Sequence, residues 1–149
     1  MSYNNLRLGR YSASGVIYHV TTVTADRAAY FRDFAAARCV VREMRGLHDG
    51  AILESLAWVL MPDHLHWLFR LGSQCNLGDA MKLFKARSAH QTNRVLGRSG
   101  RVWQRAFYDH GVRRDEDLVA TARYIVANPI RAGLVERAGM YPFGDAVWV

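Results

Sequence analysis

The chain has 149 residues, half of them hydrophobic, which favours one domain with an ordinary buried core. No apolar run approaches the ~20 residues that a membrane-spanning helix needs, and the first residues lack the apolar core of a signal peptide, so we expect a cytoplasmic protein rather than a membrane protein. Cys39 and Cys75 lack the spacing of a zinc site or a disulfide framework. The net charge is +7 and the isoelectric point about 9.9, which suits a nucleic-acid partner.

Hydrophobic periodicity predicts alternating strands and helices along the chain. In chain order, these are strand 16–24, helix 26–45, strands 52–60 and 64–71, helix 77–96, strand 101–112 and helix 115–127. The order β-α-β-β-α-β-α predicts an α+β fold, a ferredoxin-like sandwich with an antiparallel sheet and an additional C-terminal helix. We expect one domain over 1–149, with a flexible N-terminal arm at 1–14 and a C-terminal tail at 129–149.

The first two helices each show one apolar face that should cover the sheet. For helix 26–45 the predicted core positions are Tyr30, Phe34, Ala37 and Val41, and for helix 77–96 they are Leu77, Met81, Phe84 and Ser88.

Two histidines stand one residue apart in strand 64–71. Because strand side chains alternate between faces, His64 and His66 point the same way. The opposite face carries Leu65 and the apolar positions Trp67, Phe69 and Leu71. Two imidazoles on one face can bind several divalent metals, although such a pair can equally be structural or simply exposed.

Helix 115–127 carries a second polar group of residues. Its apolar stripe is formed by Leu118, Ala122 and Ile125, while a separate stripe holds Asp117, Thr121, Tyr124 and Asn128. A tyrosine used only for packing belongs with the apolar stripe, so Tyr124 is a candidate reactive group. A half-buried tyrosine with its hydroxyl in water remains the alternative, and Asn128 before Pro129 also suits a helix end.

Basic residues are concentrated in one stretch, and 18 of the 20 in the chain are arginine. Arginine suits phosphate recognition, but a GC-rich genome would also favour it. Residues 82–114 hold a single acid, Asp109, and the candidate DNA-binding residues Lys82, Lys85, Arg87, Arg94, Arg98, Arg101, Arg105, Arg113 and Arg114. The interleaved Trp103, Phe107 and Tyr108 can either stack on unpaired bases or belong to the core.

Five motifs together resemble the single-tyrosine HUH transposases of the IS200-like group, and most of all the REP-associated tyrosine transposases. In chain order they lie at 18–22, 61–66, 103–105, 108–110 and 124–135, and they include His64-Leu65-His66 and Tyr124 with Asn128-Pro129. Many of the wider single-tyrosine group carry the longer Gln where this chain has Asn128, whereas the REP-associated branch is similar to it there.

The resemblance implies a DNA transposase-like enzyme that cleaves and rejoins single-stranded DNA. Tyr124 would be the nucleophile that forms a 5′-phosphotyrosine intermediate, and His64, His66 and Asn128 would hold Mg²⁺ or Mn²⁺. The implied substrates are hairpins of palindromic repeats, and a monomer is favoured over a homodimer. His110 is a possible accessory base or a structural residue.

Two other functions remain open on the sequence alone. One is a domesticated, sequence-specific DNA-binding protein with little or no catalytic role. The other is a metal-dependent hydrolase or an RNA-binding module that shares only the sheet, although the aromatic motifs of a typical RNA-recognition module are missing.

Overall fold

The computed structural model describes residues 15–147, so the predicted arm at 1–14 lies outside the described residues. Its centre is a five-stranded antiparallel sheet in the order β4-β1-β3-β2-β5. The strands are β1 Ile17–Val23, β2 Leu53–Met61, β3 His64–Leu71, β4 Tyr108–Val112 and β5 Gly144–Ala146.

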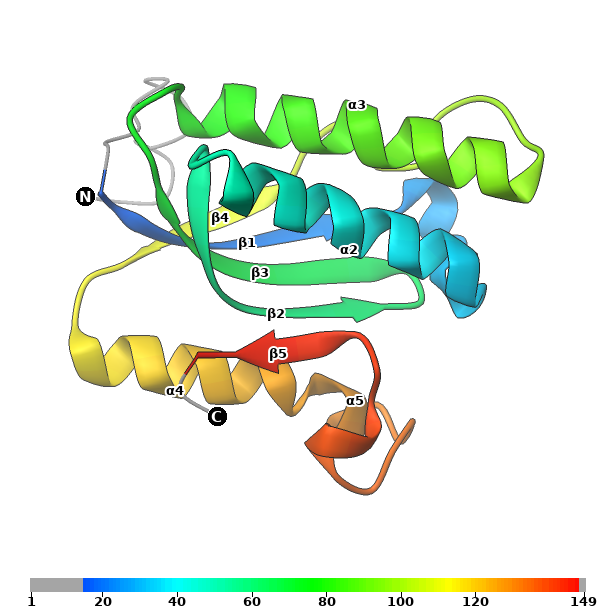
Figure 1. Cartoon of the computed structure of the whole chain (residues 1–149). Helices are drawn as coiled ribbons and strands as arrows, with labels where there is room; N and C mark the ends of the chain where they lie inside the picture. The colour runs from blue at the N-terminus through cyan, green and yellow to red at the C-terminus, as the bar shows by residue number, and fades with distance from the viewer. Residues whose placement is uncertain (1–14, 148–149) are drawn as a thin grey trace.

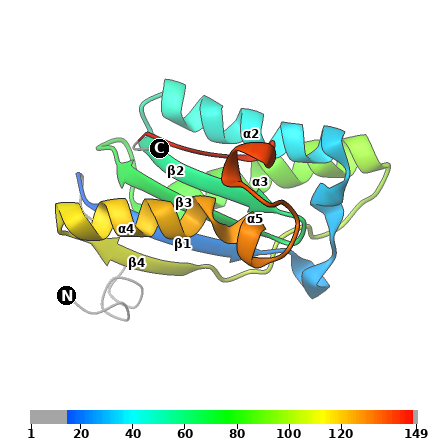
Figure 2. The ribbon, with the colours of Figure 1, turned by 90° about the horizontal axis from the view of Figure 1, so that it is seen from below.

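Helices cover both faces of the sheet (Figure 1). The first face carries α2, Phe34–Asp49, and α3, Leu77–Leu96, while the second carries α4, Asp115–Val126, which packs on β2, β3 and β5. Seen from below, α4 runs across this second face and continues into the short α5, Asn128–Arg131 (Figure 2). The predicted α+β sandwich with an added C-terminal helix is confirmed.

The two faces of β3 have opposite chemistry, as its alternation predicts. Leu65, Trp67, Phe69 and Leu71 are at most 2% exposed and pack with the buried residues of α2 and α3. β2 joins β3 through the two-residue turn Pro62-Asp63. Because this hairpin fixes the register, Val59 pairs with His66 and Met61 with His64 on the second face.

An irregularity interrupts β2 at Leu56. Ser55 pairs with Phe69 and Ala57 with Leu68, so β2 has one residue more than β3 between these pairs, which is a β-bulge. The bulge leaves Ser55 on the first face, where its Oγ accepts a hydrogen bond of 2.9 Å from Trp67 Nε1. It also leaves Ala57 on the second face, in the cluster beneath α4.

The first helix begins later than predicted. It starts at Phe34, after Asp33, whose Oδ1 accepts a hydrogen bond of 2.9 Å from Ala36 N, and it runs through Gly46 to Asp49. Residues 25–32 instead form two 3₁₀ turns, and Asp26 and Arg27 have φ of 57° and 52°, which an α-helix does not allow. The shifted start turns Phe34, predicted as core, outward to 57% exposure.

The other differences concern the last third of the chain. The predicted strand 101–112 pairs regularly only over Tyr108–Val112, apart from an isolated bridge between Thr24 and Trp103. The predicted tail at 129–149 contains most of α5, a 3₁₀ turn at Ala138–Met140, and β5, which pairs with β2 at the edge of the sheet. Among residues 15–147, no helix is long and apolar enough to cross a bilayer.

Candidate active site

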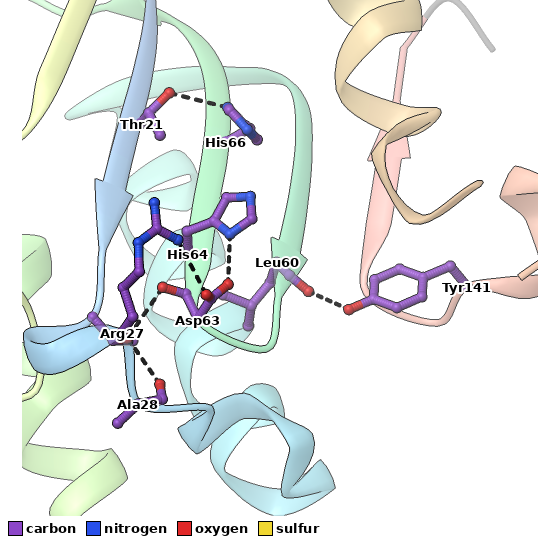
Figure 3. A network of polar contacts seen from close by, with 9 residues as sticks. Thr21, Arg27, Ala28, Leu60, Asp63, His64, His66 and Tyr141 are labelled. Carbon is purple, nitrogen blue, oxygen red and sulfur yellow. Dashed lines mark hydrogen bonds and ion pairs between the residues drawn. The ribbon is translucent and has the colours of Figure 1, made fainter. Parts of the chain in front are cut away.

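His64 begins β3, directly after the hairpin turn, and its ring is held by the turn itself. Its Nδ1 lies 2.7 Å from Asp63 Oδ1, while Asp63 Oδ2 accepts a hydrogen bond of 3.2 Å from Arg27 (Figure 3). Burial by itself raises the pKa of Asp63, but His64 and Arg27 together bring it below its usual value. An ionised Asp63 accepts a hydrogen bond from the Nδ1–H of His64, which leaves Nε2 as the ring nitrogen available to a ligand.

His66 lies two residues further along β3 and its ring is approached by β1. Its Nδ1 is 3.0 Å from Thr21 Oγ1 and 3.1 Å from His19 Nε2, and the His64 and His66 ring centroids are 5.1 Å apart. Burial, followed by the charges of neighbouring groups, lowers the pKa of His66 to about 3. Both predicted histidines therefore lie on one face of the sheet, and His66 is neutral at physiological pH.

His19 belongs to this site although the sequence did not single it out as a ligand or base. Burial and then the charge of His110 lower the pKa of His19 to about 4, so it is also a neutral imidazole. It pairs with Leu68 on β3 and with His110 on β4. The strand parity of β1 places His19 and Thr21 on one face, but only the strand order could show that this face adjoins His66.

Tyr124 is presented to the histidines by α4. The apolar stripe Leu118, Ala122 and Ile125 is buried against the second face of the sheet, as predicted. This packing leaves Tyr124 53% exposed, with its ring edge-on to His66 at 6.3 Å between centroids. The structure therefore brings the predicted nucleophile to the predicted metal site.

Arg131 lies at the end of α5 and folds back onto Tyr124. Its guanidinium carbon is 3.9 Å from the centre of the Tyr124 ring, and Nη2 donates a hydrogen bond of 2.6 Å to the Tyr124 carbonyl. Its charge is also among the causes of the lowered pKa of His66. His66 from β3, Tyr124 from α4 and Arg131 from α5 thus lie next to one another.

The two histidines fit part of a divalent-metal site. Neutral imidazoles with one nitrogen engaged by a neighbouring side chain are the form in which histidine binds metal ions. Within residues 15–147, however, no group of three or more His, Cys, Asp or Glu side chains is arranged to hold a metal by itself. Asn128, half-buried at the start of α5, stays a predicted third ligand.

Comparison with known proteins identifies the family. The family model described as "Transposase IS200 like" matches residues 12–128, most of the chain. The chain belongs to the IS200-like transposase family. The predicted resemblance is thus confirmed at the level of the family.

Individual relatives agree with this assignment. The chain is 28% identical over 146 residues to a Haemophilus influenzae protein named "Putative REP-associated tyrosine transposase", covering 88% of this chain and 80% of the relative. It is 27% identical over 88 residues to the REP-associated tyrosine transposase of Escherichia coli, covering 58% and 50%. A solved REP-associated tyrosine transposase bound to a REP hairpin has the same fold, with a TM-score of 0.74 and 22% identity over 91% of this chain and 79% of that one.

The predicted DNA-binding residues of this family member divide between two sides of the molecule. Lys82, Arg87 and Arg94 are exposed on α3, which covers the face opposite the histidines. Arg101 and Arg105 are exposed on the connection between α3 and β4. Arg98 is half-buried, with its guanidinium carbon 4.4 Å from the centre of the Tyr30 ring.

Arg113 and Arg114 lie between β4 and α4, at the start of that helix. They line a depression of about 570 Å³ between β4 and α4, together with His110, Asp117 and Thr121. Thr121 lies on the α4 stripe that carries Tyr124, so the depression continues the site along the helix. Of the predicted basic set, these two arginines are the ones that line this depression.

Lys85 has a different environment from the other predicted DNA-binding residues. Its Nζ donates hydrogen bonds to the carbonyls of Gln104, Arg105 and Ala106 at 2.8, 3.3 and 3.0 Å, and burial lowers its pKa to about 8. Carbonyl oxygens have replaced water around the ammonium group. We interpret Lys85 as the residue that holds the α3–β4 connection in place.

The aromatic residues of the basic stretch differ in how far they are buried. Trp103 is 3% exposed and its Nε1 donates a 2.9 Å hydrogen bond to Ser88 Oγ, so it belongs to the core. Tyr108 is 60% exposed on the edge strand β4, where its ring is accessible for stacking on a base.

Proposed function

We propose that the chain is a single-strand DNA endonuclease and strand transferase that uses Tyr124 as its nucleophile. The observation that carries the proposal is the exposed Tyr124 ring placed against His66 by a helix whose apolar stripe is fully used in packing. Family membership supports transposition chemistry, and the order of the motifs supports the single-tyrosine type.

The proposed step is a transesterification at phosphorus. The Tyr124 hydroxyl gives up its proton, its oxygen bonds to the scissile phosphorus, and the bond from phosphorus to the 3′-oxygen breaks. That oxygen takes up a proton as a free 3′-hydroxyl, which leaves a 5′-phosphotyrosine. Because the phosphodiester energy is kept in the new bond, a second 3′-hydroxyl can reverse the reaction and join strands.

His64 and His66 would bind a divalent ion, Mg²⁺ or Mn²⁺, with Asn128 as the third protein ligand. Such an ion supplies Lewis-acid polarisation of the scissile phosphate and offsets charge on the leaving oxygen. A free phenol titrates near ~10, so Tyr124 needs this or another nearby positive group before it attacks well at neutral pH. His110 stays a candidate base: it is exposed on β4 beside His19.

The proposed substrate is single-stranded DNA that folds into hairpins of palindromic repeats, bound by a monomer. The relative whose fold matches was solved with a REP hairpin, which supports this class of ligand. Arg113 and Arg114, which line the depression at the start of α4, would bind phosphates of DNA that extends from Tyr124 along the helix, while the exposed residues of α3 would contact DNA that passes around the edge of the sheet.

Covalent trapping tests the proposal. A labelled hairpin with a single-stranded flank is incubated with Mn²⁺ and the protein, and adducts are separated on a denaturing gel. We expect an adduct with the parent chain and none with Tyr124→Phe, which loses only the attacking oxygen and keeps hairpin binding. Tyr108→Phe is the matched control and should keep the adduct. Binding without any adduct would support the domesticated DNA-binding alternative, and an adduct in Tyr124→Phe would show that the nucleophile is misassigned.

A further inference from the structure

We propose that Arg131 is the positioning residue of the tyrosine nucleophile. The inference rests on the proposed function, because it concerns how Tyr124 is held for attack. Its basis is the double contact between the two residues: the guanidinium lies 3.9 Å from the ring centre, and Nη2 binds the Tyr124 carbonyl at 2.6 Å.

The backbone explains how Arg131 reaches Tyr124. α4 ends at Val126, and α5 begins at once with Asn128-Pro129 and ends before Gly133, whose φ is +74°. Carbonyls in the last turn of a helix lack partners within the helix, and Arg131 satisfies one of them, that of Tyr124. The contact therefore caps α4 and fixes its last turn, which carries the nucleophile.

The stack limits where the ring can go. An exposed tyrosine on a helix surface ordinarily exchanges between rotamers on a fast timescale. With one ring face covered by Arg131 and the ring edge-on to His66 at 6.3 Å, the phenol is kept on the histidine side of α4. A flat guanidinium can stack on a ring and present several N–H donors in the same plane, a geometry that the compact ammonium of lysine does not reproduce.

The position of Arg131 also suits the substrate. It is exposed, and the Tyr124 carbonyl engages only one of the five N–H donors of its guanidinium. The remaining donors can bind a phosphate oxygen next to the attacking hydroxyl. Arg131 would then orient the nucleophile and the phosphate toward each other.

Single-turnover adduct formation with saturating hairpin tests the inference. A misplacement of about 1 Å can cost ~100-fold in rate, so Arg131→Ala should form the adduct about 10–100-fold more slowly. Its hairpin affinity should fall much less and its melting temperature by only a few degrees. Ethylguanidinium in the buffer should restore part of the rate of Arg131→Ala, and Arg131→Lys should remain slow. The matched control is Arg137→Ala, an exposed arginine nearby in the chain, which should react as the parent does.

A second readout requires no cleavage. Protons of the Arg131 side chain over an aromatic face should show upfield NMR shifts in the parent and in Tyr124→Phe, which keeps the ring, and not in Tyr124→Leu. Three results would each overturn this inference without affecting the proposed function. The first is the absence of these shifts in the parent. The others are equal rates for Arg131→Ala and Arg137→Ala, and a loss of hairpin affinity in Arg131→Ala as large as its loss of rate. An adduct that persists in Tyr124→Phe would overturn the proposed function, and this inference with it.

Discussion

Leu65 and His64 are neighbours in β3 whose replacement should have opposite consequences. Leu65 is fully buried beneath α2 and α3, and truncating such a leucine to alanine costs about 3 kcal/mol. For a chain of this size ~1 kcal/mol corresponds to about 2–4 °C, so Leu65→Ala should melt about 6–12 °C below the parent. Cleavage should persist at temperatures where the variant is folded, because Leu65 faces away from Tyr124.

His64→Ala should give the reverse result. The side chain of His64 is 20% exposed and its main polar partner is Asp63, which keeps its contact with Arg27 when the imidazole is removed. The loss of one hydrogen bond costs about 1 kcal/mol, which is a few degrees of melting temperature. Mn²⁺-dependent adduct formation should nevertheless be abolished.

Calorimetric melting and adduct formation at 20 °C, measured on both variants, check the pair of predictions. If His64→Ala melts far below the parent while Leu65→Ala does not, the faces of β3 are assigned in reverse. His64 would then be a packing residue, and the proposed metal site would be lost.

Three further changes test the surroundings of the site. Replacing Arg113 and Arg114 with glutamine should reduce the slope of log affinity for single-stranded DNA against log salt by about 1.4, since each phosphate contact contributes ~0.7; an unchanged slope in a salt titration would place the strand elsewhere. Lys85→Met should lower the melting temperature but leave that slope unchanged, because its ammonium is held by backbone carbonyls; a reduced slope would instead make it a DNA contact. Asp63→Ala should weaken Mn²⁺ binding by about 10–100-fold in calorimetric titration, because Nδ1 of the adjacent histidine loses its partner; unchanged affinity would show that this carboxylate does not orient the ligand.

The features that sequence predicts well here are those set by local periodicity. The opposite faces of β3 follow from strict alternation, and the separation of Tyr124 from the buried stripe of α4 follows from helical spacing. Both patterns are long enough that no tertiary contact was needed to recognise them. That the histidines and the tyrosine meet in the structure depends in addition on how α4 packs on the sheet.

The features that sequence could not predict depend on contacts between distant segments. Asp26 and Asp33 are equally suitable N-caps by residue type. The helix begins after Asp33 because the backbone at 26 and 27 is left-handed, which only the structure shows. His19 joins the site because β1 pairs with β3, and Arg131 because the chain turns at Asn128-Pro129. β5, with three residues, is too short to leave a periodic signal.

The bulge in β2 has a consequence for deletion of single residues. Removing one residue from a central strand normally transfers every following side chain to the opposite face. Removing Leu56 would instead leave Ser55 and Ala57 opposite Phe69 and Leu68, as they are now, so the histidine side of the sheet would keep its strand register. The shortened strand would lose the buried Leu56 side chain from the cluster beneath α4, and it would lose the Leu56 carbonyl, which accepts a 2.9 Å hydrogen bond from Val147 beyond β5. The extra residue therefore serves as an attachment point for the end of the chain, and its deletion would release that end while sparing the register on which cleavage depends.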